Sequence, residues 1–202
     1  MSQTARASPW LSMWTEPRET IRWIVQTNPR YGVFWLAMIY VLQGFFFFMN
    51  FWSFGLLSSW LSLLVPALIL TPLFAFVWIF FYSWILKWTG RWLGGHAPGS
   101  HLRAALAWSK IPMAISLAMW FFLLITNPDY VFIQYVGGTS AVFVIFITCI
   151  LEIWSFVLFI QSIREVQHFS ILRSLANIFL SSLIYSAILF MGMLFVRYFY
   201  FM

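Results

Sequence analysis

Charged side chains are scarce in this chain, and their scarcity excludes most soluble folds. Only 8% of the 202 residues are Asp, Glu, Lys or Arg, whereas 63% are hydrophobic. A soluble domain carries about 25% charged residues, so this chain could not cover a water-exposed surface with polar groups. No charged residue lies between Tyr31 and Lys87. We therefore expect an integral membrane protein that holds most of its mass inside the bilayer.

Acidic residues and cysteine are scarcer still, which limits the chemistry available. The chain has five acidic residues, three histidines and one cysteine. Cys149 alone can form no disulfide within the chain and no cysteine-based metal site, and its apolar surroundings predict a small buried side chain. Neither the dinucleotide fingerprint nor the P-loop pattern is present. We therefore expect no enzyme activity, no metal and no cofactor.

The net charge of +6 comes from eleven Lys and Arg against five acids. Nucleic-acid binding would need these cations to cluster on a soluble surface. Here they are scattered between apolar runs, which is typical of residues that set membrane topology. We therefore expect the lipid bilayer, and no nucleic acid, as a partner.

Five apolar segments are long enough to approach the roughly 20 helical residues that cross a bilayer. They lie at residues 33–52, 57–86, 111–126, 139–163 and 175–196. Pro66 and Pro72 interrupt the second segment, which leaves open whether it forms one kinked span or two short ones. The pattern predicts an all-α fold: a polytopic membrane bundle of five transmembrane helices with short interfacial helices.

The connections between these segments alternate in charge. The first thirty residues hold four arginines, and the next basic connection, 87–110, holds Lys87, Arg91, Arg103 and Lys110. The connection after the fourth segment holds Arg164 and Arg173. The connection between the first and second segments and that between the third and fourth contain no cation. Because basic loops stay in the cytoplasm, we expect the N-terminus inside and the C-terminus outside.

Residues 17–26 and 100–110 are amphipathic without being long enough to span. We expect both to lie on the inner membrane surface against anionic lipid headgroups, or alternatively to dock a cytoplasmic partner. The predicted organisation is a cytoplasmic tail with an interfacial helix at 1–30 and one five-helix domain at 31–202. The domain would carry a basic cytoplasmic loop at 87–110.

Glu152 is the most informative single residue, because it lies in the middle of the fourth apolar segment. A charge at that depth costs at least about 2.5–3 kcal/mol, so the carboxyl must face the bundle interior, be protonated or pair with a donor. One hypothesis is a proton, cation or headgroup site. The other is a protonated carboxyl bonded to a neighbouring hydroxyl or carbonyl. Candidate hydroxyls are Ser109, Ser116, Thr71, Ser181, Ser182 and Ser186.

The remaining candidates lie in the expected inner-surface loops: Arg91, Gly94, Gly95, Arg103, Trp108, Lys110, Pro112, Glu165 and His168. Glu165 and His168 are three positions apart and would share a face if the helix continued. Glu-x-x-His also occurs in di-metal bundles, but those need a second copy and further carboxylates, which this chain lacks. We expect a polar turn rather than a metal site.

The order of these features resembles the Yip1 domain family in its short bacterial form. The most specific part is Gly94-Gly95 followed by Ala107-Trp108-Ser109 and Pro112, and the resemblance covers nearly the whole chain. It implies five spans with a cytoplasmic N-terminus, here in a bacterial inner membrane. Eukaryotic members of the family interact with Rab GTPases, but their long cytosolic N-terminal region has no counterpart here, so we do not carry that partner over.

Two hypotheses of function follow. The first is a non-enzymatic scaffold or accessory protein that organises the membrane or a partner protein through its cytoplasmic loops, as a homo-oligomer or beside another membrane protein. The second is a small transporter or lipid translocator with a midplane carboxylate site at Glu152. The direction in which Glu152 points distinguishes them, since a translocator needs it in a cavity and a scaffold does not.

Overall fold

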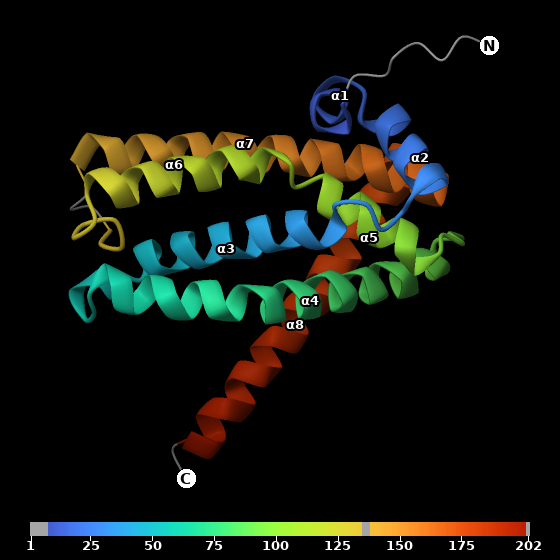
Figure 1. Cartoon of the computed structure of the whole chain (residues 1–202). Helices are drawn as coiled ribbons and strands as arrows, with labels where there is room; N and C mark the ends of the chain where they lie inside the picture. The colour runs from blue at the N-terminus through green and yellow to red at the C-terminus, as the bar shows by residue number, and fades with distance from the viewer. Residues whose placement is uncertain (1–7, 135–137, 201–202) are drawn as a thin grey trace.

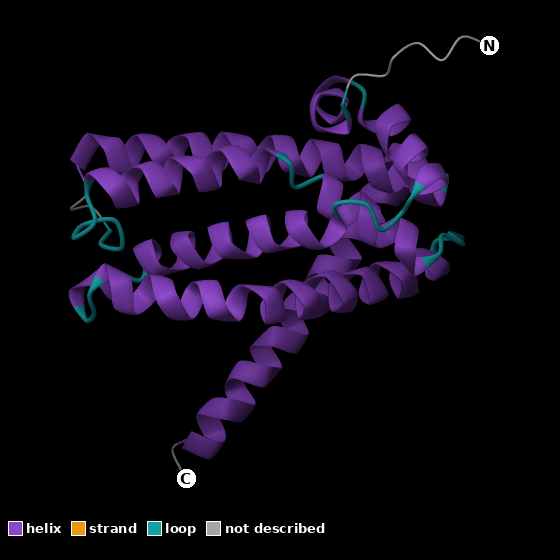
Figure 2. Cartoon of the chain, viewed as in Figure 1, coloured by secondary structure: helices purple, strands orange, loops and turns teal. Residues whose placement is uncertain are grey.

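The computed structural model of the chain describes residues 8–134 and 138–200. Within these ranges every regular element is a helix (Figure 2), which confirms the all-α prediction. The elements, in order, are α1 Pro9–Thr15, α2 Pro17–Thr27, α3 Val33–Phe51, the short 3-10 helix η1 Phe54–Leu56, α4 Trp60–Trp92, α5 Gly99–Trp108, α6 Pro112–Thr126, α7 Gly138–Gln167 and α8 Ile171–Tyr200.

The long helices form two neighbouring pairs, α3 with α4 and α6 with α7 (Figure 1). Contacts between α3 and α6 join the pairs, and α8 packs against α4 and α7 before its C-terminal half leaves the bundle. At one end, α1, α2 and α5 gather beside the last turns of α4 and α7. We call this the polar end, because Arg18, Arg22 and Glu165 meet there.

Among the described residues, α3, α4, α7 and α8 are each long and apolar enough to cross a membrane. A fifth span exists only if α5 and α6, which meet at a 46° bend, are counted together. The expected third span, residues 111–126, therefore corresponds to α6, which has 15 residues and is short on its own. The break between α5 and α6 comes just before Pro112, which has no N–H to continue the helical bonding.

The second apolar segment forms one continuous helix, α4, of 33 residues, with Pro66 and Pro72 inside it. Of the two alternatives, two short spans are therefore wrong. The helix starts where the Ser59 side chain accepts a hydrogen bond from the backbone N–H of Ser62. It extends past the expected end at residue 86, so that Lys87 and Arg91 belong to its last turns rather than to a loop.

The prediction of a surface-lying segment at 100–110, within a basic loop at 87–110, is wrong. Most of it forms α5, whose residues from Leu102 to Trp108 are buried except for Arg103. Alanine at three of these positions lets α5 approach α2, α3, α4 and α7 closely, as small residues do between membrane helices. By contrast α2 matches its predicted amphipathic pattern, burying Ile21 and Ile24 while Arg18 and Arg22 stay half exposed.

Candidate functional site

Glu152 forms a partly buried ion pair with Lys110. The Lys110 Nζ atom lies 2.6 Å from Glu152 Oε1 and 4.4 Å from the centre of the Tyr40 ring. The lysine side chain is only 10% exposed, whereas the carboxylate side chain is 47% exposed. The cation is therefore enclosed by protein and by an aromatic face, and the anion is the accessible member of the pair.

The break between α5 and α6 places Lys110 in the interior. The Trp108 indole N–H donates to the Tyr31 carbonyl at 2.9 Å, which anchors the end of α5. The chain then turns, with the Lys110 N–H bonded to the Ala107 carbonyl and the Met113 N–H bonded to the Lys110 carbonyl. Lys110 thus lies at the junction of α5 and α6, where it is buried.

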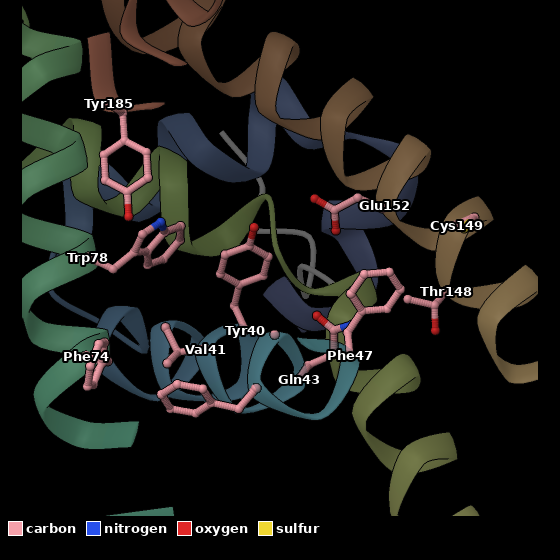
Figure 3. Close-up of a pocket in the computed structure, with 12 residues that line it drawn as sticks. Tyr40, Val41, Gln43, Phe47, Phe74, Trp78, Thr148, Cys149, Glu152 and Tyr185 are labelled. Atoms are coloured by element: carbon pink, nitrogen blue, oxygen red, sulfur yellow. The ribbon is translucent and has the colours of Figure 1, made fainter. Parts of the chain in front are cut away.

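Glu152 lines a half-open cavity of about 500 Å³ formed by residues of α3, α4, α7 and α8 (Figure 3). Its polar lining consists of Tyr40, Gln43, Thr148, Glu152 and Tyr185. The remaining walls are mainly aromatic and aliphatic. Tyr40 from α3 and Glu152 from α7 project from facing helices toward this space. The cavity combines the Glu152 carboxylate with an apolar wall, as sites for amphipathic ligands combine polar groups with apolar surface.

The site lies far from the polar end. Glu152 precedes Glu165 by 13 positions on the same helix, a separation of about 20 Å along the axis. Half the hydrocarbon thickness of a bilayer is about 15 Å, so with the polar end at the membrane surface this carboxylate would lie within the apolar layer. An ionisable group at such a depth marks a candidate functional site.

The polar end contains the second ion-pair cluster. Glu165 accepts from Arg22 Nε at 2.6 Å and lies 3.1 Å from Arg18 Nη2. The carboxylate is 7% exposed, and the arginines are 48% and 53% exposed. The hydrogen bond and charge of Glu165 raise the pKa of the Arg22 guanidinium further above its usual value. This cluster fastens α2 to the end of α7.

Glu165 and His168 do not form a joint site. His168 follows the end of α7 with φ of +55°, and the Phe169 N–H bonds to the Arg164 carbonyl. This is a Schellman ending, which takes His168 off the helical face that carries Glu165. Within the described ranges, no group of three or more His, Cys, Asp or Glu side chains is placed to hold a metal ion.

The paired glycines contribute to packing at the polar end. Gly94 has φ of +85°, a backbone region that favours glycine, and it ends α4. Gly95 lies against Gln167 and Phe169, where an added Cβ would overlap both side chains. Gln167 in turn accepts a hydrogen bond from the Ala97 N–H. Arg91, on the last turn of α4, is exposed.

The hydroxyls predicted as partners of Glu152 form other bonds. Ser109 donates to the Leu106 carbonyl, and Ser116 pairs with Thr148 at 2.8 Å. Thr71, Ser181 and Ser182 bond to the Ala67 carbonyl, Thr89 and Tyr82 respectively, and Ser186 is exposed. The actual partner of Glu152 is Lys110. One feature of the sequence could have indicated this: the lysine follows an alanine-rich run and precedes Pro112 by two residues.

Cys149 is exposed and lines the cavity beside Glu152, so the prediction that it is a buried residue is wrong. Its apolar neighbours in the sequence belong to a helix whose outer faces meet lipid, and apolarity there does not imply burial in protein. The cavity residues Tyr40, Gln43 and Tyr185 were also missed, because they lie on separate helices without a common sequence pattern.

Comparison with known families matches the chain to the Yip1 domain over residues 11–194. This match covers most of the chain, and the residues of the cavity lie within it. Searches of curated proteins and of solved structures found no match.

Proposed function

The chain belongs to the Yip1 domain family, and from that premise we propose that it is a non-enzymatic membrane protein that binds a zwitterionic phospholipid and moves its headgroup through the bilayer. The observation that carries the proposal is the Lys110–Glu152 pair, which presents its carboxylate to an intramembrane cavity. A pair kept only for structure would gain from enclosing both charges, since an exposed intramembrane carboxylate is costly.

The cavity offers complementary partners to such a headgroup. A phosphate could replace Glu152 at the Lys110 ammonium, and a ligand ammonium could pair with the freed carboxylate and the Tyr40 ring. Each charge would exchange one oppositely charged partner for another. Because both protein charges are already removed from water in the ion pair, ligand binding would not desolvate them a second time. Phe45, Phe47 and Phe74 supply an apolar wall suited to acyl chains.

Lipid movement in proteoliposomes tests this function. Vesicles containing the purified protein and a fluorescent phosphatidylcholine would be treated with dithionite, which bleaches only the outer leaflet. We expect the wild type to expose the inner-leaflet label, and Glu152→Gln to slow this about tenfold, the effect of losing about 1.4 kcal/mol of ligand stabilisation. Glu165→Gln, which removes a carboxylate from the same helix outside the cavity, is the control. Equal rates in wild type and Glu152→Gln would refute the proposal.

The single cysteine allows binding to be measured apart from movement. Cys149 lines the cavity, so phosphatidylcholine added to the protein in micelles should slow its reaction with a maleimide. The control is the Cys149→Ser, Ile153→Cys double variant, since Ile153 is exposed and does not line the cavity. Protection of both positions to the same degree would argue against a bound lipid in the cavity.

We also propose a bacterial inner-membrane location with the polar end in the cytoplasm. Arg18, Arg22, Lys87 and Arg91 lie on the elements gathered at this end, in keeping with the positive-inside rule. This orientation puts the C-terminus outside. A tag after residue 202 should react with impermeant reagents in intact cells, and protection of that tag would reverse the assignment.

A scaffold role remains a second candidate, supported by α8. Only 11% of its most apolar stretch is buried inside the molecule, against 39% for α3, and its C-terminal half leaves the bundle (Figure 1). Exposed Leu183, Phe190 and Met193 could pack on a second copy in the membrane. Crosslinking in native membranes would test this. A dimer linked through α8 would support a scaffold, and a monomer would argue against it.

A further inference from the structure

A groove between α4 and α5 gathers basic and aromatic side chains outside the Lys110–Glu152 cavity. We propose that this groove is a binding site for one anionic phospholipid, with its phosphate held between Lys87 and Arg103. The proposal does not depend on lipid movement through the central cavity, because the two sites share no lining residue.

The charge of the groove is wholly positive. It has a volume of about 520 Å³, and Lys87 from α4 and Arg103 from α5 are the charged residues among those that line it. Neither cation forms an ion pair within the described part of the chain. Arg103 instead packs over Phe80, with its guanidinium carbon 4.5 Å from the ring centre. The cations are therefore held near one another without a protein anion to neutralise them.

The start of α5 adds to this positive field. Gly99, the first residue of α5, lines the same groove. A Cβ built on Gly99 would lie 3.3 Å from Arg103 Nη1, so the guanidinium packs closely over the helix start. The first N–H groups of a helix lack intrahelical acceptors and carry partial positive charge. A phosphate beside Arg103 would meet this helix end as well.

The apolar lining favours a lipid over a free phosphate. Val77, Phe81 and Trp84 continue the groove along α4, away from Lys87 and toward the middle of the helix. Val77 and Trp84 are 52% and 58% exposed, so they can contact an acyl chain. The cations thus lie at the polar end of the bundle and the apolar surface follows toward the membrane interior. This arrangement matches basic pockets between membrane helices that bind anionic headgroups.

Native mass spectrometry of the purified full-length protein can test the site. The protein would be released from nanodiscs of equal phosphatidylglycerol and phosphatidylcholine, and the lipids that remain bound would be counted. We expect the wild type to retain one phosphatidylglycerol in preference to phosphatidylcholine. The Lys87→Gln, Arg103→Gln double variant should weaken this preference about thirtyfold, since each cation near an anionic headgroup contributes about fivefold.

The controls separate charge, fold and ligand source. Arg91→Gln removes an exposed cation one turn beyond Lys87 on the same helix, and it should leave retention unchanged. Arg103→Lys keeps the charge and should retain most of the binding. Glycerol phosphate in excess should not displace the lipid if the apolar groove contributes, and full displacement would mean a site for phosphate alone.

Equal retention of the two lipids by the wild type would overturn the proposal, and this measurement needs no variant to fold. Loss of preference in Arg91→Gln as large as in the double variant would overturn it too. The Glu152→Gln variant should keep its phosphatidylglycerol. This result distinguishes a failure of the proposed groove site from a failure of the proposed lipid movement through the central cavity.

Discussion

Two carboxylates on α7 form ion pairs of opposite arrangement. At the polar end, Glu165 is buried and its partners Arg18 and Arg22 are about half exposed. In the middle of the helix, Lys110 is buried and Glu152 is about half exposed. Each cluster thus encloses one sign of charge and presents the other, cations at the polar end and an anion in the cavity.

The difference shows what each cluster can do. Half-exposed arginines at a polar end stay solvated, so the ion pairs of Glu165 hold α2 against α7 but contribute little to the free energy of folding. At Glu152 the enclosed group is a lysine, which has no other carboxylate within the described ion pairs. The middle of α7 therefore needs its exposed carboxylate for stability while also presenting it to a ligand. Substitutions in the two regions should separate these roles.

The largest effect should come from Glu152→Leu. This change leaves the Lys110 ammonium buried without a counter-ion, and breaking a buried pair on one side costs about 3–5 kcal/mol. Stability would be measured by titrating the protein in mixed micelles with sodium dodecyl sulfate. Glu165→Gln should cost clearly less, because the arginines that it frees are solvated. A larger loss for Glu165→Gln would reverse our comparison.

Gly95→Ala should come next, with a loss of about 1–3 kcal/mol for overpacking. Its Cβ would overlap Gln167 and Phe169, which are buried at the polar end. Gly44→Ala is the matched change at the cavity, where nothing lies within 4 Å of an added Cβ. Alanine in the α3 helix should leave stability unchanged or raise it by up to about 1 kcal/mol. The same unfolding titration compares Gly95→Ala with Gly44→Ala. Equal losses of stability would mean that other groups already fill the space beside Gly44.

The Lys110→Met, Glu152→Leu double variant should be within about 1 kcal/mol of the wild type. Replacing both members of a buried pair with apolar groups is often neutral, unlike removing one. The double variant should nevertheless lose lipid movement in proteoliposomes. A stable double variant that still moves lipid would show that the pair serves only the fold.

The smallest effect should come from Arg18→Gln, because its partner Glu165 keeps Arg22. The change should weaken the attachment of α2 only at low salt, since screening at ~0.5 M reduces such surface pairs. Protease protection of the α2 segment at low and high salt would measure this. A loss that persists at high salt would mean that packing, and not charge, is what Arg18 supplies.

Part of this arrangement was predictable from single segments of sequence. The apolar runs predicted the long helices, because helices are the simplest way to satisfy backbone hydrogen bonds in lipid. The sequence also singled out Glu152 as a candidate site residue, because a charged side chain in the middle of an apolar segment is costly. The pattern at 17–26 predicted α2, whose two faces meet different surroundings.

The partners of these residues were not predictable in the same way. Alanine and leucine with two cations at 102–110 are compatible with a helix on the membrane surface or with one inside the bundle. Only the packing of α5 against α2, α3, α4 and α7 decides between them. Lys110 was assigned to the surface because a lysine is usually solvated, and a short sequence does not show that a distant carboxylate will meet it.

The sequence by itself determined that this protein resides in the membrane, that its described elements are helical, and that Glu152 has an uncommon position. These properties depend on hydrophobicity and local hydrogen bonding, which each segment carries alone. The tertiary structure decided that Lys110 is buried, that Glu152 faces a cavity, and that Lys87 and Arg103 share a groove. Those pairings join residues on different helices, so they exist only once the helices have packed.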